Sequence, residues 1–595
     1  MQSVFNSKSI AVLPFLNIGK EENEYFADGI SEEIINALTK IEGLKVTART
    51  SSFFYKNKPL DARHIGNELG VETLLEGSVR IIKERVRITA QLIRTDNGFH
   101  IWSENFDREL SDIFELQDEI SLLIADKIRE NFGHFELQEH LVATPTNNIE
   151  AYKLFLQGRS FQLNWHLEDI NTAITFYKKS VAIDPLFADA YVGIGWCYGI
   201  LASWQFIDLE EGLAKAADYL NKGISLNPDS HVGHFAKATI SFWGNWNYGE
   251  GLANLEKSLD LLPKFTEALE AKAEIFTALG KFDLAKKAID EALEINPLSP
   301  NHHYTKGNLY YLQGQYAKSI ISLDASLKID PTFILSIELK TACLILQHDY
   351  DAFHRYMEGT PQLERPKICA QLFDLVNGTN HFANQKGNAN TDEFQLKSSH
   401  LPWAFYRMIY LEDYKTALQN LKQNTVLRTG QYINFANDPF LNPLRKHQEY
   451  VDIETAVFKD IVVPQIEFTP KKTSNSYPFE KEELQEFVQQ LETEMKTDKP
   501  FLNPELSLKK LAADISLHPN KLSWLLNNHF GKNFNDYVNK HRIKEFQQLA
   551  VAPENKNITL LGLAYDSGFN SKTVFNTFFK KETGMTPKQW VKGNS

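Results

Sequence analysis

Two groups of polar side chains near the end of the chain have the types and spacing needed to contact nucleic-acid bases and phosphates. Asparagine amides pair with the edge of adenine, and lysines bind guanine or phosphate oxygens. Each group lies on one side of a short helix whose other side is apolar. The candidate DNA contacts are Asn520, Lys521, Ser523, Trp524, Asn527, Asn570, Ser571, Lys572, Thr573, Asn576, Lys580 and Lys581.

The first group belongs to a pair of helices joined by a tight turn. An apolar stripe at helical spacing follows Ser507, a suitable N-cap, and a turn is predicted at 516–518. Pro519 suits the first position of the second helix, whose leucines face inward and leave the candidate contacts outside. The apolar residues are Leu508, Leu511, Ala512, Ile515, Leu522, Leu525 and Leu526.

The second group repeats this arrangement. A supporting helix is followed by a turn at Gly568-Phe569, and a second helix begins at Asn570-Ser571. A helix-turn-helix lays its second helix in the major groove. A connecting helix over roughly 533–549, about 25 Å long, would place the two reading helices in successive grooves about 34 Å apart. The expected apolar residues are Ile558, Leu561, Leu563, Ala564, Val574, Phe575, Phe578 and Phe579.

These residues resemble the signature of the AraC family of transcription regulators. The resemblance covers about 95 residues and is carried by 558–572, Phe575, 578–581 and 583–587, with Leu511-Ala512, Leu522-Ser523, Gly531, Phe534 and 537–542 upstream. It implies double-stranded promoter DNA as the partner and a homodimer on repeated half-sites, although no heptad seam is visible. Gly562 and 590–592 depart from the family pattern, away from the reading face.

Charge is distributed as this interpretation requires. Residues 501–595 hold 13 Lys and Arg against 7 Asp and Glu, a balance of +6, whereas the whole chain holds 63 against 76. A basic end on an acidic chain favours local binding of phosphates. The alternative is that these lysines and asparagines form an ordinary solvated surface.

Composition restricts the classes of protein to which the chain can belong. A chain of 595 residues with 43% apolar residues predicts three to five globular domains. Cys197, Cys343 and Cys369 lack metal-ligand spacing and are expected to be reduced core thiols. No secretion signal or 18-residue apolar run is visible, so we expect a cytoplasmic bacterial protein that does not enter a membrane.

Residues 1–135 alternate strand and helix patterns and predict an α/β domain with a mixed sheet. Strands are expected at 10–15, 44–47, 76–82, 85–94 and 99–106, and helices at 30–41, 61–69 and 116–132. The runs 10–15, 24–29, 48–53, 76–80 and 85–92 resemble a TolB/FlgO-type domain, found ahead of tetratricopeptide arrays and sometimes beside a nucleotide cyclase. That resemblance implies a fold but no catalytic residues.

Residues 145–355 contain an internal repeat. Pro185, Pro228, Pro263, Pro297 and Pro331 recur at spacings of 43, 35, 34 and 34 residues, which is typical of tetratricopeptide repeats. Such repeats stack into an all-α solenoid with a groove for a peptide or a neighbouring domain.

The repeat pattern weakens over 356–463, which we expect to cap the solenoid, with a polar loop at 378–392. Residues 464–500 form a linker and a lead-in helix, and 501–595 form the all-α tandem helix-turn-helix domain. The fold class is therefore multidomain.

The remaining candidate sites leave alternatives open. Arginines of the first domain could hold an anion, but solubility and domain docking are favoured: Arg49, Arg80, Arg85, Arg87 and Arg94. Aromatic clusters could line a groove, but packing between repeats is favoured: Trp243, Trp246, Tyr248, Tyr304, Tyr310 and Tyr311. The pair His302-His303 suits a surface or groove better than a metal. No phosphate loop, HExxH or nucleophile elbow occurs, so no catalytic residue, cofactor or metal is expected.

The leading hypothesis is a sequence-specific transcription regulator in which the upstream domains sense or receive a signal. The effector, whether peptide, protein or small molecule, stays open. The alternative is a tetratricopeptide interaction scaffold in which DNA binding is secondary. An enzyme acting on a nucleotide in the first domain has no support from the residues themselves.

Overall fold

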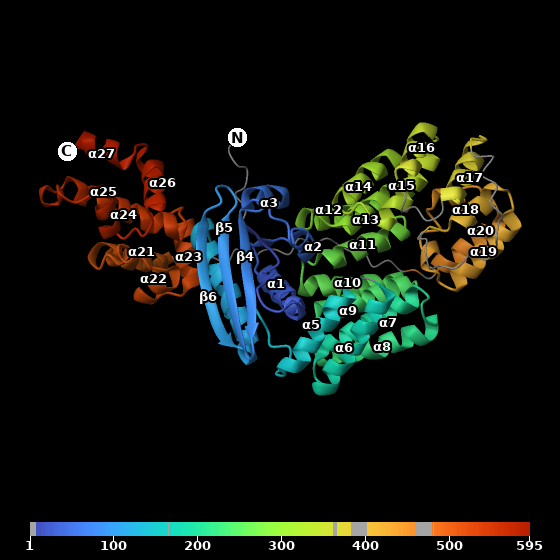
Figure 1. The fold of residues 1–595 in the computed structure, drawn as a ribbon, viewed down its shortest axis with the longest axis horizontal. Helices are drawn as coiled ribbons and strands as arrows, with labels where there is room; N and C mark the ends of the chain where they lie inside the picture. The colour runs from blue at the N-terminus through green and yellow to red at the C-terminus, as the bar shows by residue number, and fades with distance from the viewer. Residues whose placement is uncertain are drawn as a thin grey trace.

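The computed structural model describes residues 8–164, 166–360, 366–381, 401–459, 461, 479 and 481–594. The expected linker at 464–478 lies outside these residues, as does most of the expected loop at 378–392. A six-stranded sheet lies between the C-terminal helices, drawn in red, and the helical solenoid (Figure 1). The fold is mostly helical and multidomain, as predicted.

The N-terminal sheet is mixed. Its strand order is β3-β1-β4-β5-β6, with β1 parallel to both neighbours, β4 to β6 antiparallel, and β2 paired with the far end of β4. The strands are β1 Ser9–Val12, β2 Leu16–Asn17, β3 Lys45–Val46, β4 Thr73–Ile82, β5 Arg85–Arg94 and β6 His100–Glu109.

Side-chain alternation along β1 divides the core between the two faces of the sheet. Ile10 and Val12 pack on the face covered by α1 (Glu24–Thr39) and α4 (Ile113–Phe132), in the larger core. Ala11 and Leu13 pack instead with residues of α3 (Ala62–Leu69) and of the turn after α2 (Arg49–Phe53). The two-residue strand β2 and the short helix α2 are missing from the sequence prediction, because segments of that length carry no periodicity.

The solenoid is built from paired helices, and each predicted proline follows the second helix of a pair. Pro297, for example, lies two residues after the end of α12. The helices are α5 Ile149–Gln162, α6 Leu167–Ile183, α7 Ala188–Ser203, α8 Leu209–Leu226, α9 His231–Thr239, α10 Tyr248–Leu261, α11 Thr266–Ala278, α12 Phe282–Ile295, α13 Pro300–Leu312, α14 Tyr316–Ile329, α15 Ile334–Leu346 and α16 Tyr350–Glu358.

Small residues allow the helices of a pair to approach closely. A Cβ added at Gly307 of α13 would lie 2.7 Å from Leu323 of α14. The same holds at Gly195 of α7, where a Cβ would lie 2.7 Å from Leu220 of α8. The spacing of small residues in the sequence therefore reports direct helix contact.

Four further helices continue the solenoid and share its core: α17 Pro366–Asn377, α18 Trp403–Tyr410, α19 Tyr414–Val426 and α20 Gln448–Phe458. The segment between α19 and α20 returns to the repeats. Asn437 there donates hydrogen bonds to the carbonyls of Thr277 and Ala278 at the end of α11. The buried carboxylate of Asp438 accepts hydrogen bonds from Tyr311 (3.0 Å) and Tyr406 (2.5 Å). A buried carboxylate with three donors, counting the backbone of Phe440, ties the cap to the repeats.

The C-terminal helices form two units joined by one long helix. They are α21 Lys481–Thr497, α22 Leu508–Asp514, α23 Pro519–Asn528, α24 Phe534–Val551, α25 Leu560–Asp566, α26 Lys572–Thr583 and α27 Pro587–Asn594. Short 3-10 or π turns also occur among the described residues: η1 Glu21–Asn23, η2 Leu110–Asp112, η3 Ile240–Gly244, η5 Gly430–Tyr432, η6 Pro439–Leu441, η7 Pro500–Leu502 and η8 Pro553–Asn555. The connecting helix α24 has 18 residues and is therefore about 27 Å long.

Candidate nucleic-acid interface

The first helix-turn-helix consists of α22 and α23, as the sequence predicts. The Ser507 hydroxyl accepts a hydrogen bond from the backbone N–H of Lys510, so Ser507 is the N-cap of α22. Ser516 takes φ of +53° in the turn, and Pro519 occupies the first turn of α23. The inward leucines of α23 are completely buried.

The second helix-turn-helix consists of α25 and α26, with a glycine turn that also contacts the first half. Gly568 has φ of +92°, and a Cβ there would lie 2.2 Å from the carbonyl oxygen of Phe501 in η7. Ser571 is the N-cap of α26, which begins at Lys572. Asn570 therefore precedes the reading helix instead of opening it. Val574, expected to be buried, is 46% exposed.

The reading face of α26 is open to solvent. Asn570, Lys572, Thr573 and Asn576 are all exposed, and Ser571 is half-buried. The Asn576 amide donates to the carbonyl of Lys572 within the helix. This group matches the prediction of an accessible polar surface.

The two lysines at the end of α26 differ in their surroundings. Lys580 and Lys581 are both exposed. The Lys581 ammonium forms an ion pair of 3.0 Å with Asp536 at the start of α24. A phosphate would therefore have to compete with a carboxylate for Lys581.

The reading face of α23 is covered by the N-terminal α/β domain. Asn520 accepts hydrogen bonds at Oδ1 from Arg129 of α4 and from the backbone N–H of Leu137 (3.3 Å). Its Nδ2 donates to the carbonyl of Leu137 (3.1 Å). Both polar atoms of the amide are therefore engaged within the chain.

Other predicted contacts on α23 are also engaged. A Cβ added at Gly133 would lie 2.8 Å from Oδ1 of Asn527. Ser523, between Asn520 and Asn527 on this helix face, is 2% exposed. The expectation that Ser523 points outward was wrong, because the α/β domain packs against that face.

The last two candidates of α23 contact α21 and the residues just before it. Trp524 packs against Phe479, with ring centroids 5.6 Å apart, and is half-buried instead of fully outside. The Lys521 ammonium forms an ion pair of 2.8 Å with Glu483 and lies 5.0 Å from the Phe479 ring centroid. The periodicity of α23 gave no sign of these neighbours, because they are distant in the sequence.

Contacts beside α23 extend the same interface. The carboxylate of Asp126 pairs with Lys509 of α22 at 2.8 Å. Glu130 accepts a hydrogen bond of 2.9 Å from the backbone N–H of Leu508. Asn533, the N-cap of α24, donates to the carbonyl of Asn131 (2.8 Å). The end of α4 therefore contacts three successive helices of the C-terminal domain.

Within the α/β domain, Arg129 is held by its neighbour on α4. Its guanidinium donates to Asp126 at 2.6 Å, and both side chains are nearly inaccessible to solvent. Burial lowers the pKa of Arg129, and Asp126 opposes that effect. Sequence reasoning missed Arg129 and Asp126, although their spacing of three residues on a helix was visible.

A second basic surface lies between α21 and α24. A groove of about 510 Å³ is lined by several lysines, by His541 and by the acidic residues Glu492 and Glu545. Lys499 forms an ion pair with Glu545 at 2.8 Å. Burial and two neighbouring lysines lower the pKa of His541 to about 4. The lysines are Lys496, Lys499, Lys532, Lys540 and Lys544.

The arginines of the α/β domain are mostly paired with acidic residues. Arg49 contacts Glu32 at 3.0 Å, and Arg85 and Arg87 share the carboxylate of Asp107. Arg94 pairs with Asp96 at 2.8 Å. These pairs favour solubility and docking over an anion site.

The aromatic clusters serve mainly in packing. Trp246, Tyr248 and Tyr311 are buried in the solenoid core, and Tyr304 packs against that core. Trp243 donates a hydrogen bond of 3.3 Å to Glu274, whose pKa is raised to about 8 by burial and by the nearby Glu270. Tyr310 is half-buried.

The histidine pair is split between the two sides of α13, as the helical spacing requires. His302 is 2% exposed and pairs with the buried Glu270 at 3.1 Å. The expectation of a surface or groove position was therefore wrong for His302. His303 hydrogen-bonds the carbonyl of Pro297 at 2.9 Å.

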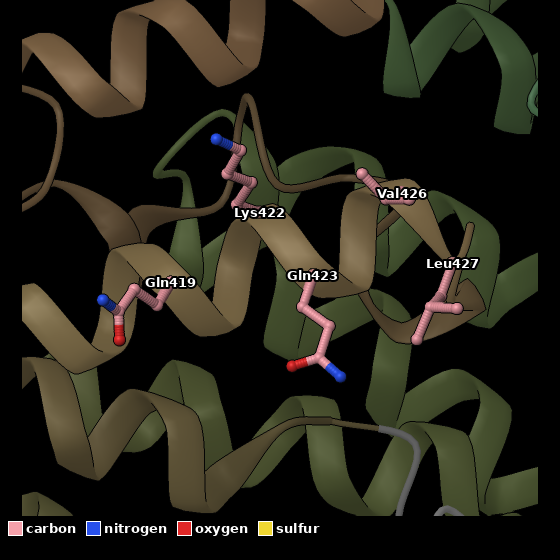
Figure 2. Close-up of a pocket in the computed structure, with 5 residues that line it drawn as sticks. All are labelled: Gln419, Lys422, Gln423, Val426 and Leu427. Carbon is pink, nitrogen blue, oxygen red and sulfur yellow. The ribbon is translucent and has the colours of Figure 1, made fainter.

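Figure 2 shows a shallow hollow on the surface of the cap. Its volume is about 340 Å³, and it is lined by α19 and the residue after it. Val426 is 73% exposed and Leu427 48% exposed. Lys422 supplies the one charged side chain of this lining, so the hollow offers no acid-base or nucleophilic pair. The lining residues are Gln419, Lys422, Gln423, Val426 and Leu427.

No cluster of three or more His, Cys, Asp or Glu residues in the described part of the chain could hold a metal ion. No helix among the described residues is both long and apolar enough to cross a membrane. The three cysteines are buried and none of them forms a disulfide, and burial raises the pKa of Cys343 to about 12.

Comparisons with protein families agree with this organisation. A model described as a helix-turn-helix domain, of the AraC type, matches residues 511–593. A model described as the second domain of HilA/YgeH-like transcriptional regulators matches 6–123, and a tetratricopeptide repeat model matches 266–297 and 303–333. The expected AraC-type domain and repeats are confirmed, and the N-terminal domain, which resembles the TolB/FlgO type, matches a HilA-like regulator domain. The matched families support a DNA-binding transcription regulator with an interaction module.

Individual relatives match parts of the chain. A Rhizobium meliloti (strain 1021) protein named "Putative adenylate cyclase 3" is 38% identical over 241 residues, which are 40% of this chain and 40% of that protein. A Rhizobium etli TPR repeat-containing protein is 31% identical over 99 residues, 16% of this chain and 48% of its own length. The chain thus spans less than half the length of these curated relatives.

Solved structures align with parts of this chain at low TM-scores. The type IV pilus biogenesis factor PilW aligns with 16% identity over 36% of this chain and 93% of its own, with a TM-score of 0.31. Human IFIT1 aligns with 12% identity over 59% of this chain and 77% of its own, with a TM-score of 0.34.

Proposed function

We propose that this protein is a sequence-specific transcription regulator that binds promoter DNA through its tandem helix-turn-helix domain, residues 501–595. The upstream α/β domain, taken as 1–135, and the repeats, taken as 145–355 with a cap at 356–463, act as the sensing or interaction part. We infer a cytoplasmic protein that controls transcription and does not catalyse a reaction. The cyclase name belongs to a relative whose alignment covers 40% of this chain.

The exposed polar face of α26 carries the proposal. Lys572, Thr573 and Asn576 lie within its first two turns, and Asn570 and Ser571 directly precede it. Lysine, asparagine and hydroxyl side chains in these positions reach base edges when such a helix enters the major groove. Lys580 at the other end of the helix is placed for a phosphate contact.

The repeats supply a route by which a signal could reach the DNA-binding domain. Their loops hold the α/β domain: Ser51 bonds to Asn296 and to the backbone N–H of Leu298, and Lys264 donates to the carbonyl of Leu44. Arg159 of α5 pairs with Glu32 of α1 at 3.0 Å. A peptide, protein or small molecule that displaces these loops would move the domain that contacts α23.

Selection from random double-stranded oligonucleotides tests the proposal. The full-length protein should enrich a defined sequence, and the variant Lys572→Ala should change the preferred base at one or two positions. Binding should weaken steeply as salt is raised, because lysine–phosphate contacts release counterions. If neither the full-length protein nor a variant in which α23 no longer contacts the α/β domain enriches a sequence, the proposal is refuted.

Oligomeric state can be measured with the selected DNA. A homodimer on repeated half-sites should give a complex of two chains per duplex by mass photometry. A complex of one chain per duplex, with both helix-turn-helix units on a single site, would contradict the proposed homodimer.

A further inference from the structure

The end of α4 and the segment 133–137 meet the C-terminal domain through contacts that resemble those of DNA. In a protein–DNA complex, an asparagine amide reads adenine by donating to N7 and accepting from the N6 amino group. Here the Asn520 amide donates to the carbonyl of Leu137 and accepts from the N–H of the same residue. The N–H and C=O of Leu137, which belong to two consecutive peptide units, thus present the donor and acceptor pair that adenine would present.

The charged groups at this interface follow the same pattern. Phosphate oxygens in DNA complexes accept hydrogen bonds from lysines and from backbone N–H groups. The carboxylate oxygens of Asp126 and Glu130 do so here, from Lys509 and from the backbone of Leu508. Acidic side chains of α4 therefore bind hydrogen-bond donors that would otherwise be available to DNA phosphates.

Burial shows that these contacts exclude a duplex. Ser523 is 2% exposed, and the Asn527 side chain lies against Gly133. A helix whose polar face is covered in this way cannot lie in a major groove, because that face must contact the base edges. By contrast, the corresponding face of α26 is exposed.

We propose that the α/β domain is an intramolecular DNA mimic: the end of α4 and residues 133–137 mask the first reading helix, so that DNA and this domain compete for α23. The masked chain binds through α26 alone, and full-site binding requires the domain to move away. The inference rests on the proposed function, because it concerns the same DNA-binding domain.

The competition can be weakened by one substitution with a matched control. Asp126→Asn removes the charge that pairs with both Lys509 and Arg129 at the interface. Glu119→Gln removes one charge from the same helix, where Glu119 pairs with Arg108 on the surface of the α/β domain. Both variants change the net charge equally, so general attraction to DNA is matched between them.

The contact can also be locked. The pair Gly133→Cys and Asn527→Cys places two thiols across the interface, because a Cβ at residue 133 would lie 3.7 Å from Cγ of Asn527. The native cysteines are all buried and do not interfere. Oxidised and reduced forms of the one double variant are compared, which cancels the loss of the Asn527 side chain.

Each protein is first used to select a sequence from random oligonucleotides, and affinity and DNase I protection are then measured on the selected duplex. Asp126→Asn should bind about tenfold more tightly than wild type and protect a second DNA segment, the one that α23 reads, while Glu119→Gln stays within about twofold. The oxidised cross-linked form should protect one segment. Its reduced form lacks the Asn527 contact and carries a residue strained at φ of +111° in place of Gly133, so it should protect both segments. Equal affinity and protection for all forms would overturn the masking inference while the proposed function stands.

If the wild type, Asp126→Asn and the reduced double variant all fail to select a sequence, the proposed function itself is overturned. If Asp126→Asn loses its cooperative thermal unfolding, the cross-linked protein still decides the matter. Protection of both DNA segments, those read by α23 and by α26, by the oxidised form would then refute masking.

Discussion

The guanidinium of Arg542 in α24 donates a hydrogen bond of 2.8 Å from Nε to the carbonyl oxygen of Phe501 in η7. Its Nη2 donates a second, of 2.9 Å, to the carbonyl of Asn503. The turn at Gly568 packs against the same backbone. One buried side chain thus joins the connecting helix, the segment before the first unit and, through that segment, the turn of the second unit.

Replacing Arg542 should loosen this junction. Arg542→Met keeps most of the apolar stem but leaves the carbonyl of buried Phe501 without its donor and removes one of the two donors to the Asn503 carbonyl, and we expect a loss of about 2–3 kcal/mol in stability. Urea denaturation followed by the intrinsic fluorescence of the tryptophans, which include Trp524 and Trp590 of this domain, measures it. Lys544→Met, at an exposed position of the same helix, should change stability by less than about 0.5 kcal/mol. Equal midpoints for the two variants would contradict the role assigned to Arg542.

The two lysines at the end of α26 should contribute unequally to DNA binding. Lys580→Ala should weaken binding to all sequences and reduce the salt slope by about 0.9, as expected for one phosphate contact. Lys581→Ala should have a smaller effect, because Lys581 is paired with Asp536. Fluorescence anisotropy at several salt concentrations distinguishes them, and a larger effect at Lys581 would show that the ion pair breaks on binding.

Asp438 should be essential for the cap. Asp438→Ala leaves the hydroxyls of Tyr311 and Tyr406 buried without an acceptor, and about 2–4 kcal/mol of stability should be lost. Differential scanning calorimetry would record the lower transition. The double variant Tyr311→Phe with Tyr406→Phe tests the reason. Adding Asp438→Ala to it should cost less than in the wild type, since the donors are already gone.

Glu274 should make stability depend on pH. Its folded pKa of about 8 lies above the ordinary value of 4.5, so the folded state binds more protons between these values. Stability is therefore fully present below pH 4.5 and is lost as the pH rises toward 8. Glu274→Gln keeps an acceptor for Trp243 but removes the titration. Between pH 5.5 and 8.5 the wild type should lose about 3 kcal/mol more than the variant. Parallel curves of Tm against pH would contradict this.

Local sequence patterns determined the elements of this protein well where they were long and periodic. The prediction of a strand at 85–94 matches β5, and the five prolines each follow the second helix of a repeat. Ser507 and Ser571 act as N-caps because a hydroxyl before a helix accepts from its free N–H groups. These outcomes depend on residues close together in the chain, so the sequence carries them directly.

The limits of the sequence appear where distant segments meet. Asn520 and Asn570 have the same residue type and a similar place before or at the start of a reading helix, yet one is held by the α/β domain and the other is exposed. Ser523 was expected to be outside because the periodicity of α23 distinguishes only its leucine face from its polar face. Residues nearly 400 positions away decide whether that polar face meets solvent.

The sequence by itself therefore determined which kinds of domain this chain contains and predicted which side chains read DNA, because helix periodicity, capping and repeat spacing are local properties. Only the tertiary structure decided which of the two reading helices is available. That outcome depends on shape and charge matching between α4 and α23, two surfaces that no local pattern relates to each other.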